Sequence, residues 1–322
     1  MTSVTVVVPA YNEGETFAGA LVTIADYFSK HRGGGYDFNY LIVDDGSRDE
    51  TYAVASSFAG RRSDVRVLQH DRNRGLGAAL RTAFAAIDSD IAVVLDADLS
   101  YTPATAMELI EQLDREGADI ALASAYAHGG SVSNVPLLRR ILSREANRLL
   151  SLATCGRYAT LTCMVRAYRV EALRRLAFAS NGMDSVAEML LDGLRKQMRV
   201  VELPATLSWS EERREAGGRF RPLSAIRRIA ATCLMACRHR PALWLALPGL
   251  FPGLLPLSVA TLLILRVNGP TLAIGTTTVV VVQYSSLALF SGQLAAFFGR
   301  RLYHRNHPNG VNNGYNVPSR SV

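Results

Sequence analysis

Short apolar runs alternate with longer amphipathic stretches over the first 125 residues. The apolar runs predict strands at 4–8, 39–44, 65–69, 91–95 and 119–123. Because these runs are nearly continuous, we expect strands that are covered on both faces. The stretches between them repeat apolar residues every three to four positions and predict helices at 15–30, 48–60, 75–87 and 103–117. This alternation predicts βαβ units and an α/β fold built on a mostly parallel sheet.

The pattern becomes mixed between residues 135 and 210. It predicts helices at 136–153 and 184–197, and strands near 162–169 and at 199–208. We therefore expect a single globular domain at 1–211.

Residues 212–240 are strongly basic and amphipathic. They carry eight Arg against two Glu, with apolar residues such as Leu223, Ile226 and Ile229 at helical spacing. This composition predicts interface helices that lie on a membrane, with their arginines directed at lipid phosphates. A solvated basic helix is the alternative.

Two segments without any charged residue follow, at 242–265 and 271–298. As helices they would span roughly 36 Å and roughly 42 Å, against about 30 Å of bilayer hydrocarbon. We expect two transmembrane helices within 241–299 and a basic, then flexible, tail at 300–322. Arginines flank this hairpin on both sides, so the positive-inside rule predicts a cell-membrane protein whose globular domain and both termini are cytoplasmic.

The composition of the chain limits the class of protein and its binding partners. Apolar residues make up 49% of the chain and charged residues 20%, enough for a sizeable core. A net charge of +7 is compatible with nucleic acid, anionic lipid or phosphorylated substrates, but the long uncharged segments argue against nucleic acid. The four cysteines lack zinc-site spacing and are expected to be reduced thiols. A homo-oligomer is compatible with this composition.

Polar and acidic residues follow three of the predicted strands. In a doubly wound sheet, ligands bind at the carboxyl ends of the strands. Carboxylates gathered there repel one another unless a cation or a donor-rich ligand joins them. We therefore expect a binding site, although each residue alone is equally typical of a turn or a helix cap. The residues at these strand ends are Pro9, Tyr11, Glu13, Asp44, Asp45, Asp96, Asp98 and Ser100.

The set of motifs resembles family 2 glycosyltransferases, which have the Rossmann-like GT-A fold. Within that family it is most similar to the polyprenyl-phosphate sugar synthases of the dolichol-phosphate mannose synthase group. The motifs are Pro9-Ala10-Tyr11-Asn12-Glu13, Asp44-Asp45-Gly46-Ser47 and Asp96-Ala97-Asp98-Leu99-Ser100. The resemblance covers nearly the whole chain. It implies metal-dependent, inverting transfer of a sugar from a GDP-mannose or UDP-hexose type of donor to a polyprenyl monophosphate at the cytoplasmic face of a lipid bilayer.

The resemblance also implies roles for single residues. Asp98, with Ser100, would hold Mg²⁺ or Mn²⁺, and Asp96 would lie beside the ribose or the metal. Glu188 would be a helical acid facing the active site, although a role within the core fits this residue equally well. A hard divalent cation on oxygen ligands suits this chemistry because it neutralises the charge that develops on a departing nucleotide diphosphate. The residues expected to contact the nucleotide sugar are Pro9, Tyr11, Glu13, Asp44, Asp45, Arg74 and Asp96.

Three groups of residues are candidates for binding phosphate. Residues 73–77 open a predicted helix, so their N–H groups and the Arg74 side chain are candidates, although an ordinary helix start fits equally well. Arg139 and Ser143 lie four apart on one predicted helix and share a face, as the acceptor-phosphate residues of the family do. Solvated surface arginines are the alternative reading. The third group is expected to close over the diphosphate as a loop and comprises Arg213, Arg214 and Arg219.

Two positions depart from the family pattern. Ala125 stands where relatives carry Arg, and Thr160 stands where they carry Asp. These departures leave open a non-catalytic protein that binds nucleotide sugar or lipid, although the intact Asp96 and Asp98 argue against it. A processive polysaccharide synthase is a further alternative, but neither tryptophan lies in the Gln-x-x-Arg-Trp motif that such enzymes need.

Overall fold

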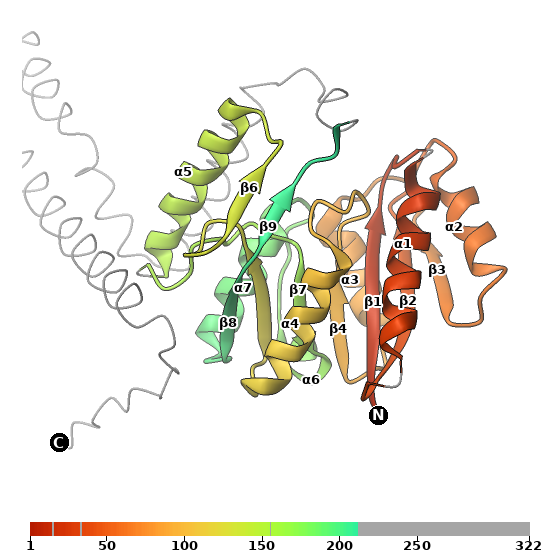
Figure 1. Ribbon diagram of the computed structural model, residues 1–322, viewed down its shortest axis with the longest axis horizontal. Coiled ribbons are helices and arrows are strands. Elements are labelled where there is room, and N and C mark those ends of the chain that lie inside the picture. The colour runs from red at the N-terminus through yellow and green to blue at the C-terminus, as the bar shows by residue number, and fades with distance from the viewer. Residues whose placement is uncertain (15, 33, 155, 212–322) are drawn as a thin grey trace, which may run out of the picture. The chain divides into compact units, whose positions relative to one another are not determined.

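The structure is a computed structural model that describes residues 1–14, 16–32, 34–154 and 156–211 (Figure 1). Apart from residues 156 and 157, all of them belong to one compact unit. The strands are β1 (Thr2–Ala10), β2 (Tyr36–Asp44), β3 (Val65–Gln69), β4 (Ile91–Val94), β5 (Ile120–Ser124), β6 (Ser131–Ser133), β7 (Arg166–Arg169), β8 (Val200–Pro204) and β9 (Thr206–Ser208). The helices are α1 (Thr16–His31), α2 (Thr51–Ala59), α3 (Leu76–Ala85), α4 (Pro103–Arg115), α5 (Leu137–Ala153), α6 (Val170–Arg175) and α7 (Asp184–Arg195).

In this part of the chain, seven strands form one sheet in the order β3-β2-β1-β4-β7-β5-β8. Strand β7 runs antiparallel to its neighbours β4 and β5, and the other neighbouring strands are parallel. Helices α1 and α4 pack together on one face, and α3 and α7 pack together on the other (Figure 1). The predicted α/β fold with a mostly parallel sheet is confirmed.

The core strands are apolar because helices cover both of their faces. Every residue of β4 and β5 is buried, and so are the last seven residues of β1. The register pairs Ala10 with Asp44 and Val7 with Val94, so the carboxyl ends of β1, β2 and β4 lie at one edge. This shared edge, which the sequence predicts, is where the candidate site is built.

Some elements differ from the sequence prediction. The single strand expected at 199–208 is divided at Ala205, where the chain passes from β8, paired with β5, to β9, paired with β6 in a second small sheet. The strand expected near 162–169 begins only at Arg166, and in the preceding loop the N–H groups of Leu161 and Thr162 donate to the Asn147 side chain of α5. Strand β6 and helix α6 were not predicted, since such short elements carry little periodicity.

Among the described helices, none combines the length and the apolar character that crossing a bilayer requires. The expected interface helices at 212–240, the two expected spans and the tail lie outside the described residues, as do Arg213, Arg214 and Arg219. They remain predictions.

Candidate active site

The loop after β1 is held by side chains that precede and open α2. Asn12 adopts a left-handed φ of 52°, which Asn tolerates better than most residues. Its N–H donates to Ser47 Oγ at 2.9 Å, and the N–H of Glu13 donates to Thr51 Oγ1 at 2.9 Å. The loop therefore has a defined conformation, in which Tyr11 is 40% exposed at the carboxyl edge of the sheet.

Asp44 is fully buried at the end of β2. Its carboxylate accepts hydrogen bonds from the hydroxyl and the N–H of Ser47, and from Nε2 of Gln69 at 3.1 Å. An Asp that bonds to the backbone shortly after itself stabilises a turn, so Asp44 shapes the path from β2 into α2. Its contact with a base or ribose stays a prediction.

Asp45 is buried as well and fastens the loop that precedes α3. Its Oδ1 lies 2.6 Å from Nδ1 of His70, and its carboxylate accepts the N–H groups of Arg74 at 2.9 Å and Gly75 at 2.7 Å. These bonds favour the alternative of an ordinary helix start, because both N–H groups already donate to Asp45. Phosphate binding at 73–77 stays a prediction. The exposed Arg74 side chain, and Asp45 itself, stay predictions as nucleotide contacts.

Asp96 and Asp98 follow β4 in one tight turn. The turn is closed by Leu99, whose φ is 54° and whose N–H donates to the Asp96 carbonyl at 3.2 Å. The N–H of Ser100 donates to Oδ1 of Asp98 at 2.8 Å. Both aspartates are partly exposed, whereas Ser100 is buried. The turn thus presents two carboxylates at the carboxyl edge of the sheet.

The charges of this turn act on the loop before β7. Burial and the negative charge of Asp96 raise the pKa of the Cys163 thiol to about 12, while the fully buried Arg166 acts in the opposite direction. Burial, the neighbouring Cys163 and Asp96 raise the pKa of Tyr101. Arg166 donates to the carbonyls of Leu161 and Val186 at 2.7 and 2.6 Å. Asp96 and the buried Arg166 therefore act in opposite directions on the same thiol.

The donor set of this turn fits a cation such as Mg²⁺ or Mn²⁺. Within the described ranges, no three His, Cys, Asp or Glu side chains gather as a metal cluster. Mg²⁺ is usually held by one or two carboxylates together with the phosphates of a substrate, so a full protein cage is not required. Asp96 and Asp98 offer two such carboxylates. The roles of Asp98 and Ser100 as ligands stay predictions.

Helix α5 carries the two residues expected to bind the acceptor. The guanidinium carbon of Arg139 lies 5.2 Å from the ring centroid of Trp209, a cation–π distance, and Ser143 is exposed one turn later. Asn147, which is buried, accepts the N–H of Leu161 at 2.8 Å and donates to the Ser143 carbonyl at 3.0 Å. These contacts fix the helix against the loop before β7. Sequence reasoning missed the role of Trp209, because no local spacing links it to Arg139.

The two departures from the family pattern lie side by side. The hydroxyl of Thr160 lies 2.7 Å from that of Ser124 and accepts the N–H of Tyr126 at 3.4 Å, on either side of the buried Ala125. Relative to the family pattern, one positive and one negative group are therefore absent from the same place.

Glu188 on α7 organises the loop that packs against α3. Its carboxylate accepts the N–H groups of Ala179 at 3.2 Å and Ser180 at 3.0 Å. The next residue, Asn181, accepts the N–H of Gly77 at 2.7 Å through its carbonyl. Glu188 thus supports the start of α3 through this loop, and its catalytic role stays a prediction.

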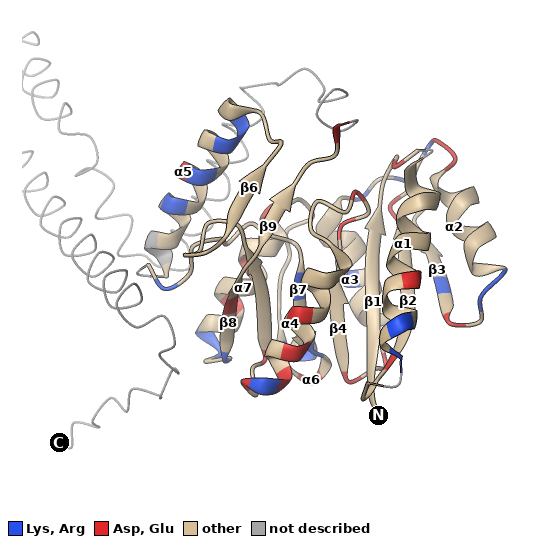
Figure 2. Cartoon of the chain, viewed as in Figure 1, with Lys and Arg blue, Asp and Glu red and all other residues tan. Residues whose placement is uncertain are grey.

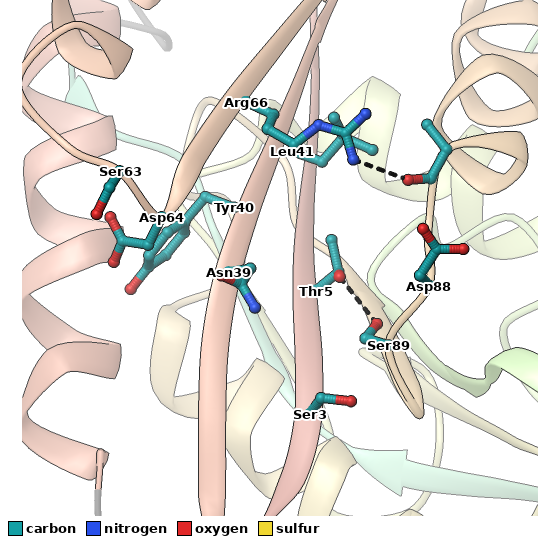
Figure 3. Close-up of a pocket in the computed structure, with 11 residues that line it drawn as sticks. Ser3, Thr5, Asn39, Tyr40, Leu41, Ser63, Asp64, Arg66, Asp88 and Ser89 are labelled. Atoms are coloured by element: carbon teal, nitrogen blue, oxygen red, sulfur yellow. Dashed lines mark hydrogen bonds between the residues drawn. The ribbon is translucent and has the colours of Figure 1, made fainter.

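A cavity of about 280 Å³ lies away from these residues (Figure 3). It is lined by Ser3 and Thr5 at the start of β1, Asn39 near the start of β2 and Ser89 just before β4. These are the amino ends of the strands. The cavity therefore does not coincide with the candidate site at the carboxyl edge.

A mostly parallel, Rossmann-like sheet with two carboxylates in the turn after β4 is typical of the GT-A fold of glycosyltransferases. The chain belongs to glycosyl transferase family 2, whose model matches residues 5–177.

Two curated relatives extend this assignment. Dolichol-phosphate mannosyltransferase of Pyrococcus furiosus is 30% identical over 205 residues, which are 63% of this chain and 56% of that protein. Polyprenol monophosphomannose synthase of Mycolicibacterium smegmatis is 31% identical over 213 residues, 64% of this chain and 77% of that protein. The matched region is thus little more than half of the archaeal relative.

Solved structures confirm the fold. Glucosyl-3-phosphoglycerate synthase of Mycobacterium tuberculosis, in complex with Mg²⁺ and uridine diphosphate, has a TM-score of 0.54 and 23% identity over 73% of this chain and 79% of that one. Its complex with Mn²⁺, uridine diphosphate and phosphoglyceric acid has a TM-score of 0.54 and 24% identity, over 73% and 78% of the two chains.

Proposed function

We propose that this glycosyltransferase moves a sugar, with inversion, from a GDP-mannose or UDP-hexose type of donor to a polyprenyl monophosphate. The observation that carries the proposal is the turn at 96–100, which presents two partly exposed carboxylates beside the ends of β1 and β2. The names of both curated relatives specify a polyprenyl-phosphate type of acceptor and mannose, which supports the acceptor and one of the two donors.

The chemistry of the acceptor suits the residues on α5. A lipid monophosphate is mostly ionised near neutral pH, so it can attack the sugar without a strong general base. It needs cations that hold it, and Arg139, steadied by Trp209, offers a guanidinium for this purpose. Ser143, one turn away on the same helix, offers a hydroxyl.

On the donor side, Asp98 and Asp96 would hold Mg²⁺ or Mn²⁺, with Ser100 in the same turn. When bound, such a cation neutralises the charge of the leaving nucleotide diphosphate. Tyr11 and Glu13, in the loop after β1, would line the base and ribose. Arg213, Arg214 and Arg219 would close over the diphosphate.

The proposed place of action is the cytoplasmic face of a membrane. It is supported by the uncharged segments 242–265 and 271–298, by the arginines that flank them, and by the basic amphipathic stretch at 212–240. The lipid bilayer would hold both the enzyme and its acceptor.

The test is a transfer assay with purified full-length protein. A short polyprenyl phosphate is incubated with a panel of GDP- and UDP-sugars, with Mg²⁺, Mn²⁺ or a chelator. We expect one donor to give a lipid-linked sugar only when the metal is present. Release of free sugar without lipid product, or transfer in the presence of the chelator, would contradict the proposal.

A further inference from the structure

The outward side of α5 exposes large apolar side chains at its beginning. Leu137 is 70% exposed, Leu138 is 55% exposed and Ile141 is 49% exposed. They account for three of the eight strongly exposed large apolar residues in the described part of the chain. A soluble surface rarely gathers such residues on a single helix turn, and contiguous apolar patches commonly mark contacts with a partner or a membrane.

Arginines continue the same side of the helix. Arg140, Arg144 and Arg148 are exposed and follow one another at intervals of four, which places them in one row. Figure 2 shows basic residues recurring along α5. The only acid exposed beside them on α5 is Glu145, which lies 3.7 Å from Arg148. The row therefore has an excess of positive charge.

We propose that this side of α5 rests on the surface of an anionic lipid bilayer. Leu137, Leu138 and Ile141 would enter the boundary between headgroups and acyl chains, and the row of arginines would contact lipid phosphates. A combination of apolar residues with excess positive charge is complementary to an anionic membrane surface. A protein partner of ordinary composition would leave several of these charges without a counterpart.

This contact deepens the proposed function. The contact itself does not depend on that function, and only the identity of the phosphate that would reach Arg139 rests on it. Arg139 is half-buried against Trp209, and Ser143 is exposed on the same flank of the helix. If the exposed side lies on the bilayer, this flank stands at the level of the lipid phosphates. An acceptor phosphate would then reach Arg139 while its polyprenyl chain stays in the membrane.

The test places an environment-sensitive fluorescent label on α5 of the full-length protein. Leu138→Cys is labelled in a background whose other cysteines are Ser, and the protein is reconstituted in vesicles that contain brominated lipids. The matched control is Val22→Cys on α1, where the native side chain is 47% exposed on another part of the molecule. Vesicles of phosphatidylcholine are compared with vesicles that also contain phosphatidylglycerol.

We expect brominated lipid to quench the label at position 138 and not the label at position 22. Quenching should grow with phosphatidylglycerol and fall at high salt, because salt screens charges near a surface. A label at 138 that is open to water would overturn the proposal. So would a label that is shielded from water but not quenched, since protein would then cover the helix. The readout needs no sugar transfer, so contact without transfer would count against the proposed function alone.

A second variant tests the same contact through the substrate. Leu137→Ser combined with Ile141→Ser should raise the KM for a membrane-embedded polyprenyl phosphate by roughly tenfold, by the usual apolar transfer scale. The KM for a short, water-soluble acceptor should be unchanged, because both side chains are exposed in the folded protein. An equal effect on both acceptors, or no effect on either, would overturn the proposal.

Discussion

Burial separates the carboxylates that shape the site from those that are placed to bind a ligand. Asp44 and Asp45 are almost wholly buried, and their oxygens accept hydrogen bonds from the protein. Asp96 and Asp98 are partly exposed in a turn that requires a left-handed backbone at Leu99. Such a conformation costs a non-glycine residue roughly 1–3 kcal/mol and is commonly retained where function needs it. We therefore expect the second pair to bind the ligand.

The first prediction at this scale concerns Asp98. Asp98→Asn keeps the shape of the side chain and removes its charge, so the folded protein should lose about 10²–10³ in turnover. The control is Asp88→Asn, where the native side chain is 96% exposed and should tolerate the same change. Turnover is measured in the transfer assay, with folding checked by thermal unfolding. Near-normal turnover that still requires metal would remove Asp98 from the site.

The second prediction concerns Arg139. A charge-assisted hydrogen bond to phosphate contributes about 1.5–3 kcal/mol, so Arg139→Gln should lower efficiency toward the acceptor roughly tenfold to hundredfold. Because Ala125 stands where the family pattern has an arginine, we expect a loss of efficiency near the upper end of this range. Nucleotide affinity, measured by calorimetry, should stay unchanged.

The matched control is Arg140→Gln, which removes the same charge from the neighbouring, exposed position of α5. Both variants are assayed with a short, water-soluble acceptor, so that contact with a bilayer does not contribute. Equal damage to acceptor use and nucleotide binding in Arg139→Gln, or to neither, would mean that the acceptor phosphate is held elsewhere.

Local signals account for the elements that were predicted well. Helix α4 begins where the sequence shows Thr102-Pro103, because the Thr102 side chain accepts the N–H of Thr105 and proline occupies the first turn. Strand β3 has the predicted bounds because its apolar run is short and clearly delimited. The division at Ala205 was missed, since it depends on pairing with the distant β6.

In the site, too, features set by local sequence could be predicted, whereas contacts between distant segments could not. Residues at strand ends could be predicted, because parallel neighbours bring those ends together whatever the loops do. The contacts of Arg139 with Trp209 and of Thr160 with Ser124 join segments far apart in the chain. The spacing of apolar residues along the sequence does not indicate such contacts. The bonds from the backbone N–H groups at 74–75 to Asp45 could not be predicted for the same reason, since Asp45 approaches them only in the folded chain.

At the scale of elements, the packing of α3 on the loop before α7 yields a stability prediction. A Cβ on Gly77 would lie 2.1 Å from the Ser180 carbonyl oxygen, so Gly77→Ala should lower the free energy of unfolding by about 1–3 kcal/mol. Gly19, inside α1, has nothing within 4 Å of such a Cβ. Gly19→Ala should therefore raise that free energy by about 0.5–1 kcal/mol.

Unfolding of both variants in denaturant measures their free energies of unfolding. We expect a decrease for Gly77→Ala and an increase for Gly19→Ala. If Gly77→Ala proves as stable as the native chain, the loop held by Glu188 does not press on α3, and its support of that helix would be disproved.

At the scale of the whole molecule, two independent features point to a bilayer. One is the outward side of α5, with Leu137 and Ile141 exposed beside a row of arginines. The other is the pair of uncharged segments at 242–265 and 271–298, which the sequence alone supplies. An enzyme whose acceptor stays in the membrane needs both an anchor and a surface that presents its site to the lipid phosphate. The two features would serve these two needs.

The last prediction concerns the orientation of the proposed two-helix anchor. The link at 266–270 carries a single arginine, whereas Arg300, Arg301 and Arg305 follow the second uncharged segment. Arginines are retained on the cytoplasmic side, so the link should face outward and the C-terminal tail inward. In a background without other cysteines, Asn268→Cys should react with a membrane-impermeant maleimide on intact cells. Ser319→Cys should react only after the cells are permeabilised. Labelling of both positions from the same side would contradict a two-helix hairpin with a cytoplasmic catalytic domain.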